Sequence, residues 1–413
     1  MKRQFLFFML FMILLFPVYG ENSDIDPPDE MSMIKEIYET ESPEIRRELI
    51  EDYFKRDDIS RQGVLYVYRI SMATLHELED YDAVERMLPD YFLALEERDP
   101  IDKAQAANEA AYILAESLKY TKEAIAWGEK ALEYFLSVTK TPRGVDPGQW
   151  EDIKIEFEAG IRDTIGYAYY RDMNDEKALP WLEQAVSLNP ADANIRYHHG
   201  LVLERLGRIQ EAWESFLYAR YYAFFESSDI ERALSRLEGK QAGDWQSVAV
   251  KNKIKAEAEQ VMRKEALQGE IKREPAPKFE LTDLDGNTVA VSDYLGRVCL
   301  IDFWATWCGP CQQEMPILQS FYEEFHSKGV EILAVSVDGP DTWEKVPGFV
   351  RDKKISFPVF LDQAEAAAAY GVQTIPALFV LDRKGNIRFV HNGFEPGLYK
   401  KLYFQAHYLL NEE

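Results

Sequence analysis

The spacing of hydrophobic residues divides the chain into two regions. From Met31 to about Arg273, apolar positions recur at helical spacing in nearly continuous segments, which predicts pairs of amphipathic helices. After Pro275, short apolar runs alternate with amphipathic segments, a pattern typical of strands joined by helices. We therefore expect two domains: an N-terminal all-α domain and a C-terminal α/β domain.

The helical region contains an internal repeat of 34 residues, clearest in residues 159–192 and 193–226. Small residues recur where two antiparallel helices can cross closely. These pairs are Gly166 and Gly200, Ala178 and Ala212, and Ala185 and Ala219. Large residues fill the intervening positions, at Tyr169, Leu182, Leu203 and Phe216, and Asn189-Pro190 closes the first unit.

By residue, these positions resemble the Gly, Tyr, Ala, Ala and Pro positions of the tetratricopeptide (TPR) family. The resemblance implies a TPR-like helical solenoid over residues 31–240, with roughly three to five stacked units that bury a continuous core. Weaker helix pairs are predicted at Asn108–Leu118 with Lys122–Leu136, and at Gly63–Leu78 with Asp82–Arg98. The concave face of such a solenoid usually binds a protein or peptide partner.

Three connecting segments complete the N-terminal part of the chain. Residues 139–150, rich in Pro and Gly, predict a loop, and the polar residues 21–30 predict a disordered lead-in. The strongly charged residues 241–274 predict a helical spacer that leads to the second domain.

The C-terminal region, residues 275–413, is expected to alternate strands and helices. The runs at Val298–Trp304 and Val330–Val337 predict inner parallel strands, joined by a helix at Gln312–Lys328. Further elements are predicted as helices at Trp343–Lys353, Ala364–Tyr370 and Leu398–Leu410, a short strand at Phe357–Leu361, and a hairpin of Ala377–Asp382 with Asn386–Val390.

Candidate chemistry lies where the first inner strand ends. Cys308-Gly309-Pro310-Cys311 follows Trp304 at the predicted junction of a strand with a helix. Unpaired backbone N–H groups and the helix dipole stabilise a thiolate there, so such cysteines reach pKa values of roughly 3.5 to 7.5. We predict Cys308 as the nucleophile. Cys311 is close enough to form a disulfide with it and to resolve a mixed disulfide.

A zinc knuckle or a structural disulfide are the alternatives for this motif. Zinc needs two or more further ligands, whereas the only other cysteine is Cys299 and the six histidines are scattered. We therefore expect no metal and no cofactor beyond a redox-active Cys308–Cys311 disulfide. Cys299, inside an apolar strand, is expected to be a buried inert thiol.

The span from Pro275 to the C-terminus resembles the thioredoxin superfamily, and within it the TlpA/ResA-type thiol:disulfide reductases. The similarity rests on the entry segment PAPKF, the hairpin-like LTDLDGNTVAVSDYLG, the block FWATWCGPC, and Thr374-Ile375-Pro376-Ala377. It implies a thioredoxin-like α/β fold with an active-site loop that includes Trp307, Gly309 and Pro310.

The same resemblance assigns roles to four further residues. Pro376 matches the family's cis-proline, and the backbone of the preceding Ile375 would pair with a substrate chain. Glu314 matches an acidic residue kept near the active site, although on sequence grounds alone a solvated helix-surface glutamate is the simpler interpretation. Pro316 matches a proline that kinks the first helix.

Asp302 departs from the TlpA/ResA pattern, in which asparagine is common, and matches a buried aspartate of thioredoxins. An acid in an apolar strand is costly unless it is neutral or paired, so its pKa should be raised, which suits a proton acceptor for Cys311. The alternative is an aspartate at a strand edge, bonded to backbone. Which of Asp302 and Glu314 moves the proton is left open.

The net charge argues against one class of function, and the N-terminal residues predict where the protein is located. A formal net charge of −25 over 413 residues argues against nucleic-acid binding, which needs clustered Lys and Arg. Lys2 and Arg3, the apolar run Phe5–Phe16 and the small Gly20 predict a signal peptide over residues 1–20. We expect an exported, periplasmic protein, with an N-terminal membrane anchor if the signal is not cleaved.

Together these features predict an exported thiol:disulfide oxidoreductase that reduces protein disulfides, with TPR repeats that recruit a partner or client. The Gly-Pro dipeptide between the cysteines resembles that of reducing thioredoxins, with potentials near about −270 mV. The resemblance further implies a membrane electron donor supplied by cytoplasmic thioredoxin, and apocytochrome c as one client. Two alternatives stay open: a thiol peroxidase, and a TPR scaffold with an accessory redox domain.

Overall fold

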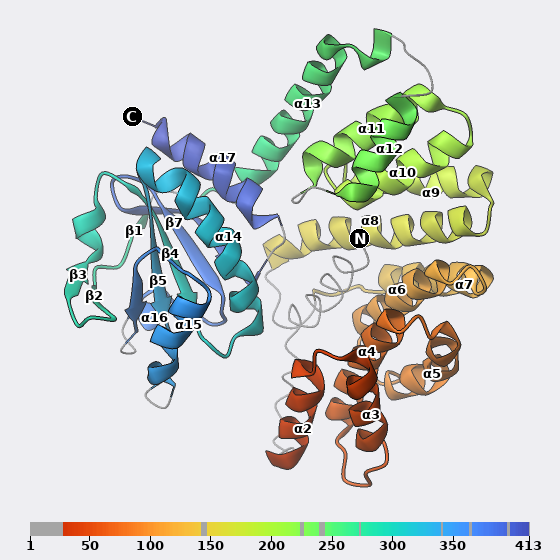
Figure 1. Ribbon diagram of the computed structural model, residues 1–413, viewed down its shortest axis with the longest axis horizontal. Coiled ribbons are helices and arrows are strands. Elements are labelled where there is room, and N and C mark those ends of the chain that lie inside the picture. Colours follow the sequence, from red (N-terminus) through yellow and green to blue (C-terminus); the bar gives the residue numbers. More distant parts are fainter. Residues whose placement is uncertain are drawn as a thin grey trace. The chain divides into compact units, whose positions relative to one another are not determined.

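A computed structural model of the protein describes residues 28–141, 147–223, 227–238, 244–271, 274–339, 342–362, 366–394 and 397–412. The chain divides into two compact units, Met1–Lys255 and Ala256–Glu413. In Figure 1 the colours follow the sequence from one unit to the other. The first is helical and the second is α/β, which confirms the predicted fold class. The predicted signal peptide, residues 1–20, lies outside the described residues. Within the described residues, no helix is long and apolar enough to cross a membrane.

Helices follow one another throughout the described part of the first unit. They are α2 (Pro28–Glu39), α3 (Pro43–Tyr53), α4 (Arg61–Glu77), α5 (Tyr81–Ala94), α6 (Pro100–Glu116), α7 (Thr121–Leu136), α8 (Pro147–Arg171), α9 (Asp175–Leu188), α10 (Ala193–Arg205), α11 (Ile209–Tyr222) and α12 (Ser228–Glu238). Helix α13 (Val248–Ala266) contains the boundary between the units. The loop predicted over residues 139–150 is wrong at its end, because α8 begins at Pro147.

The start of the helical unit also differs from the prediction. Helix α2 begins at Pro28, so the last three residues assigned to a disordered lead-in are helical. Glu30 is fully buried, and its carboxylate accepts hydrogen bonds from the Tyr53 hydroxyl (2.6 Å) and the Ser60 backbone N–H (2.8 Å). Both bonds fall on Oε1 and tie α2 to the segment between α3 and α4, whereas Oε2 has no hydrogen-bond partner among the described residues. They therefore offset only part of the cost of burying the carboxylate.

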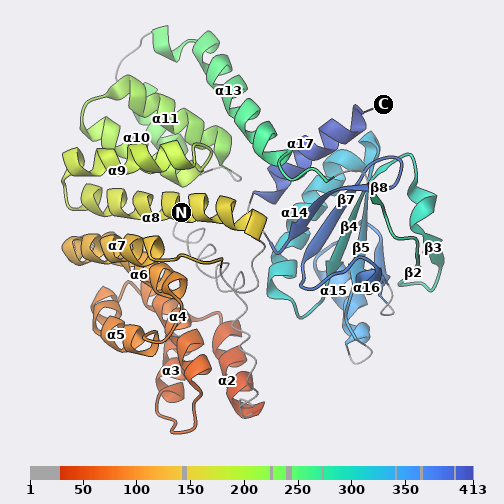
Figure 2. The ribbon, with the colours of Figure 1, turned by 180° about the vertical axis from the view of Figure 1, so that it is seen from behind.

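The helices pack as consecutive pairs, α4 with α5, α6 with α7, α8 with α9 and α10 with α11 (Figures 1 and 2). The turn inside each pair contains a residue with positive φ, at Glu79, Leu118, Met173 and Gly207. Three of these turns share a further bond at 2.9 Å, in which Asp80 N–H donates to Leu75 O, Asn174 N–H to Tyr169 O and Arg208 N–H to Leu203 O. Such bonds close helix ends, and the last two lie 34 residues apart.

Close helix crossings recur at the same interval. A Cβ on Gly166 would lie 2.6 Å from Leu182 Cγ, and one on Gly200 would lie 2.5 Å from Phe216 Cε1. The alanines predicted beside them, Ala178, Ala185, Ala212 and Ala219, are all fully buried. The two clear repeats therefore share one packing scheme, in which a glycine on the first helix receives a large side chain from the second.

This scheme predicts the effect of filling one crossing. Gly200→Ala should destabilise the helical unit by about 1–3 kcal/mol, because overpacking against Phe216 outweighs the better helix propensity of alanine. Gly160→Ala, inside α8, is the matched control, since a Cβ there meets nothing within 4 Å. We expect the control to be neutral or slightly stabilising in urea unfolding of the full chain. Equal shifts for both variants would contradict the packing argument.

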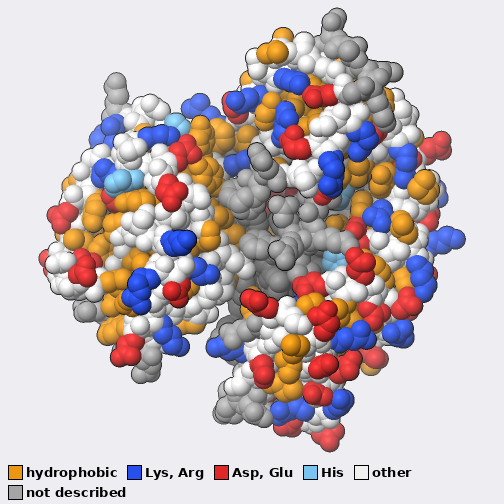
Figure 3. Space-filling view, viewed as in Figure 1, with side chains coloured by type: hydrophobic (Ala, Val, Ile, Leu, Met, Phe, Trp, Pro, Cys, Tyr) orange, Lys and Arg blue, Asp and Glu red, His pale blue; other side chains and the backbone are white. Residues whose placement is uncertain are grey.

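The hydrophobic interior of the helical unit consists of successive clusters along the chain of helices. One cluster joins helices α4 to α8, the next joins α6 to α8, and another joins α10 to α13. This series is typical of stacked helix pairs, where each pair buries its apolar face against its neighbours. On the face drawn in Figure 3, acidic and basic side chains are interspersed over these helices.

The second unit is built on one mixed sheet of the order β1-β8-β7-β4-β5-β6-β2-β3. The strands are β1 (Glu274–Pro275), β2 (Glu280–Asp283), β3 (Thr288–Ala290), β4 (Val298–Trp304), β5 (Val330–Ser336), β6 (Val359–Leu361), β7 (Ala377–Leu381) and β8 (Asn386–Asn392). Strands β4, β5 and β6 are parallel, and the other neighbours are antiparallel. The predicted inner parallel pair and the β7–β8 hairpin are confirmed.

In the described part of this unit, four α-helices accompany the sheet: α14 (Gly309–Phe325), α15 (Val346–Asp352), α16 (Ala366–Ala369) and α17 (Leu398–Leu410). Rings of α14 and α17 pack together, with centroids 5.8 Å apart for Phe321 and Tyr399 and 5.6 Å apart for Phe325 and Tyr403. Figures 1 and 2 show both helices on the same face of the sheet. Helix α14 thus starts at the end of β4 and is held against the sheet beside α17.

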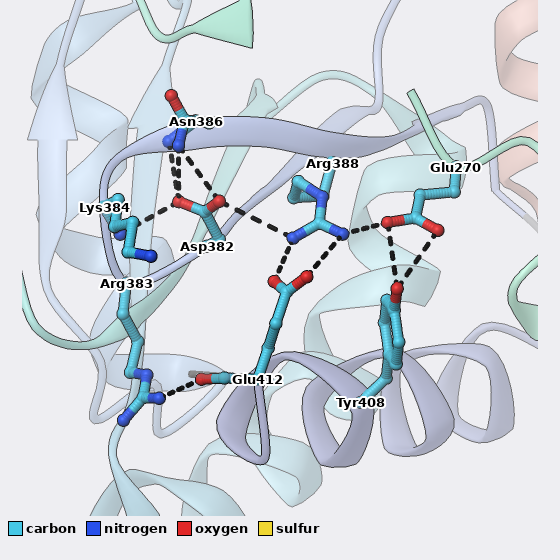
Figure 4. A network of polar contacts seen from close by, with 8 residues as sticks. All are labelled: Glu270, Asp382, Arg383, Lys384, Asn386, Arg388, Tyr408 and Glu412. Carbon is cyan, nitrogen blue, oxygen red and sulfur yellow. Dashed lines mark hydrogen bonds and ion pairs between the residues drawn. The ribbon is translucent and has the colours of Figure 1, made fainter. Parts of the chain in front are cut away.

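A buried arginine ties the segment before β1 to this unit (Figure 4). Arg388, on β8, is 2% exposed and forms ion pairs with Glu412 and Glu270, and its guanidinium lies 3.6 Å from Asp382. The backbone follows the same path, because Ile271 N–H donates to Arg388 O at 2.8 Å. Residues just after α13 are therefore bonded into the α/β unit.

Candidate active site

The two cysteines of the CxxC motif form a disulfide at the start of α14. Cys308 is the residue that caps this helix, and the backbone N–H of Cys311 donates to its Sγ at 3.2 Å. Cys308 is 5% exposed and Cys311 is fully buried. The cap places the Cys308 sulfur at the positive end of the helix dipole, where a thiolate is favoured once the disulfide is reduced.

The loop that leads into β7, the antiparallel neighbour of β4, lies against this disulfide. The Ile375–Pro376 peptide bond is cis, and the carbonyl oxygen of Ile375 is 3.8 Å from the Sγ of Cys308. Pro376 is buried, and its carbonyl oxygen accepts a hydrogen bond from the Gly393 N–H at 2.8 Å. The loop therefore presents backbone beside the sulfur that a client disulfide would approach.

The rest of the active-site segment is more open. Trp307 is 62% exposed, whereas Gly309 and Pro310 are partly exposed. Pro310 lies in the first turn of α14. Backbone N–H groups in a first turn have no acceptor within the helix, so proline costs no helical hydrogen bond there. An exposed indole next to a nearly buried sulfur gives this surface an apolar contact for an incoming polypeptide.

Asp302 lies in the middle of β4 and between two neighbouring strands, paired with Ala334 of β5 and Leu378 of β7. It is 1% exposed, and neither carboxylate oxygen has a hydrogen-bond partner among the described residues. The alternative of a strand-edge aspartate bonded to backbone is therefore wrong. Burial raises the pKa of Asp302 to about 8, because the charged form loses its hydration.

The orientation of Asp302 follows from strand alternation. Cys299, Ile301 and Phe303 join one hydrophobic cluster on a single face of the sheet, and no residue of α14 belongs to that cluster. Asp302 points to the opposite face, together with its neighbours Leu300 and Trp304. This arrangement places the carboxyl on the face that α14 covers.

Glu314 is buried in α14, three residues after Cys311, and is 1% exposed. The simpler sequence interpretation, a solvated helix-surface glutamate, is therefore wrong. Residues three apart lie on the same face of a helix, so Glu314 and Cys311 face the same way. Asp302 and Glu314 are thus both buried acids of the α/β unit.

Cys299 is a buried free thiol on β4, as its apolar surroundings predict. Burial raises the pKa of this thiol to about 12, and the nearby carboxylate of Glu331 acts in the same direction. At neutral pH it is thus protonated and a poor nucleophile. It also lies near the opposite end of β4 from the CxxC motif.

Sequence reasoning missed one pair of residues at the site. Thr306, in the turn between β4 and α14, is bonded through its N–H and hydroxyl to Asp338, which follows β5. The available signal was positional: Thr306 and Asp338 each come just after a parallel strand, and the carboxyl ends of parallel strands meet at one edge of a sheet.

A thioredoxin-like fold with a CxxC disulfide at a helix N-terminus, beside a cis-proline loop, defines the class of thiol-disulfide oxidoreductases. Known proteins agree with this assignment. A model of the AhpC/TSA family matches residues 273–390. Thiol-disulfide oxidoreductase ResA of Bacillus thuringiensis subsp. konkukian (strain 97-27) is 39% identical over 113 residues, which cover 27% of this chain and 64% of ResA.

ResA of Geobacillus thermodenitrificans (strain NG80-2) is 38% identical over 119 residues, which cover 29% of this chain and 67% of ResA. The crystal structure of StoA from Bacillus subtilis aligns with 32% of this chain and 99% of StoA, at 28% identity and a TM-score of 0.28. Through its C-terminal domain, the chain belongs to the ResA-type thiol-disulfide oxidoreductases.

Proposed function

We propose that the protein reduces disulfides in client proteins outside the cytoplasm. The observation that carries this proposal is the Cys308–Cys311 disulfide at the start of α14, with the Ile375 carbonyl 3.8 Å from the Cys308 sulfur. The exported location rests on the signal-like sequence of residues 1–20 and on the resemblance to TlpA/ResA-type proteins.

The proposed reaction is a two-step thiol-disulfide exchange. The Cys308 thiolate attacks one sulfur of a client disulfide, a mixed disulfide forms, and the other client sulfur leaves as a thiolate that takes up a proton. Cys311 then loses its proton to the carboxylate form of Asp302 or Glu314 and attacks the Cys308 sulfur, which breaks the bond between Cys308 and the client. The client leaves with two thiols, and the Cys308–Cys311 disulfide forms again.

An external donor must then return two electrons to the Cys308–Cys311 pair. We propose, by resemblance to the TlpA/ResA type, a membrane protein that carries electrons from cytoplasmic thioredoxin. Apocytochrome c is one client that the same resemblance suggests.

The helical unit is proposed to be a TPR-like solenoid that recruits a partner or client polypeptide. Support comes from the 34-residue recurrence of the Gly166 and Gly200 crossings and of the Met173 and Gly207 turns. A recruiting surface linked to the redox domain raises the effective concentration of a bound client near Cys308.

The direction of electron flow can be measured. We expect a reduction potential near about −270 mV, as for thioredoxin, and efficient reduction of insulin disulfides by dithiothreitol-charged protein. Equilibration with glutathione or dithiothreitol, followed by alkylation and mass measurement, gives the potential. A value above about −180 mV would overturn the reductase assignment and favour an oxidase or isomerase.

A thiol peroxidase is the second candidate function, and the match to the AhpC/TSA family model favours it. Comparing the turnover of hydrogen peroxide with insulin reduction separates the two activities. Faster peroxide turnover, lost on Cys308→Ser, would support the peroxidase.

A TPR scaffold with an accessory redox domain is the third candidate function. In that case the Cys308→Ser/Cys311→Ser double variant should retain partner capture and the cellular phenotype of the wild-type protein.

A further inference from the structure

The turn that precedes Cys308 is held by bonds to each polar group of Thr306. The Thr306 N–H donates to Asp338 Oδ2 at 2.8 Å, and its hydroxyl donates to Asp338 Oδ1 at 2.6 Å. The Thr306 carbonyl oxygen accepts from Gln312 Nε2, in the first turn of α14, at 2.8 Å. One residue of the turn is thus joined to the segment after β5 and to the helix that carries both cysteines.

Asp338 is buried just beyond the C-terminal end of β5, an inner strand of the sheet. It is 1% exposed, and its Oδ2 also accepts from the Ser336 hydroxyl at 2.8 Å. The parallel ladder pairs Trp304 with Ser336, and Val337 N–H donates to Trp304 O at 2.7 Å, so the two chain segments leave the sheet together. A buried carboxylate is costly unless its oxygens are bonded, and here three donors from two segments satisfy it.

We propose that Asp338 is a positioning residue for thiol-disulfide exchange, which fixes Thr306 and thereby the turn that presents Cys308. The proposal rests on the proposed function and adds a residue to its site. Asp338 touches neither sulfur. It acts by keeping the Cys308 and Cys311 sulfurs at a high effective concentration and Cys308 beside the Ile375 carbonyl.

We call the bonds that join Thr306 to Asp338 and Gln312 the clamp. It can be tested in the full chain by changing one bond at a time. Thr306→Val deletes the hydroxyl at nearly constant volume, whereas Thr306→Ser keeps it. Asp338→Asn replaces one acceptor oxygen by a donor that faces Thr306. We expect Thr306→Val and Asp338→Asn to reduce insulin about 10-fold more slowly, and their disulfide to be about 3- to 10-fold easier to reduce in glutathione equilibrium. Thr306→Ser should stay within about twofold of wild type.

Asp382→Asn controls for general loss of stability. Asp382 is also a buried aspartate that accepts backbone hydrogen bonds, from Lys384 (2.9 Å) and Asn386 (3.0 Å). It follows Leu381, which pairs with Cys299, so it lies at the end of the sheet opposite the CxxC motif. Urea unfolding should show destabilisation of this variant, while its glutathione equilibrium and insulin reduction stay as in wild type.

Three results would overturn the proposal. The first is that Thr306→Val and Asp338→Asn behave as wild type. The second is that Thr306→Ser is as defective as Thr306→Val. The third is that Asp382→Asn shifts the glutathione equilibrium as much as Asp338→Asn does. If wild-type protein fails to reduce insulin, the reductase function is refuted instead. The glutathione equilibrium still reports on the Cys308–Cys311 pair in every variant, so the clamp is tested in either case.

Discussion

Replacing Cys311 by serine is expected to leave the protein covalently joined to its clients. Cys308 caps α14 and is the more accessible sulfur, so it still attacks a client disulfide. The mixed disulfide then persists, because a serine hydroxyl at the fully buried position 311 cannot displace the client thiolate. Non-reducing gels and mass spectrometry of the trapped species should show adducts that dithiothreitol releases.

The matched variants make this result specific. Cys308→Ser should trap nothing and lose insulin reduction by on the order of 1,000-fold or more, because the attacking group is gone. Cys299→Ala should behave as wild type, since that buried thiol stays protonated and lies away from the motif. Adducts formed by Cys308→Ser and absent from Cys311→Ser would reverse the roles of the two sulfurs.

Asp302→Asn is expected to remove a pH dependence from the stability of the oxidised protein. An unfolded chain ionises this carboxyl near about pH 4, whereas burial raises the pKa of Asp302 to about 8 in the folded protein. Between these values the unfolded state has lost a proton that the folded state keeps. Stability therefore falls as pH rises from about 4 to about 8, by up to about 5 kcal/mol in total.

The asparagine variant cannot ionise at this position, so its advantage over wild type should grow across that window. At pH 8 we expect this variant to be more stable than wild type by on the order of 3 kcal/mol. The gain is smaller than the full effect because burying the amide also costs hydration free energy. Urea unfolding at several pH values, with the disulfide intact, measures the difference. Parallel wild-type and Asp302→Asn curves would show that the carboxyl is not held neutral.

The same variant identifies the acid that serves Cys311. If Asp302 accepts the Cys311 proton, Asp302→Asn should slow resolution of a preformed mixed disulfide by about 100-fold at pH 7. Glu314→Gln is the matched change on the helix side of the site. A slower rate in Glu314→Gln with a normal rate in Asp302→Asn would assign the proton transfer to Glu314.

Local sequence patterns predicted most of the α/β unit. The run Val298–Trp304 is apolar apart from Asp302 and has the bounds of β4, because a central strand is buried on both faces. Leu398–Leu410 likewise has the bounds of α17, since its apolar stripe repeats at helical spacing. The CxxC motif needs only spacing and a helix start to be recognised.

Tertiary contacts decided the features that sequence patterns missed. Sequence patterns place Glu30 in a disordered lead-in and Glu314 on a solvated helix surface, yet both side chains are buried. Asp338 contacts Thr306 across 32 positions of sequence, and nothing local marks that bond. The burial of Glu30 and the bond between Asp338 and Thr306 each depend on a partner from another element, which hydrophobic periodicity does not encode.

The ion pairs of Arg388 determine where a fragment that contains only the redox domain has to begin. A cut at Pro275, where the family resemblance begins, would remove Glu270 and leave a buried guanidinium with less counter-charge. It would also remove the Ala266 carbonyl that accepts from Gln405 of α17 at 2.8 Å. An autonomous redox fragment must therefore begin upstream of Ala266, inside the helix that sequence alone suggests is only a spacer.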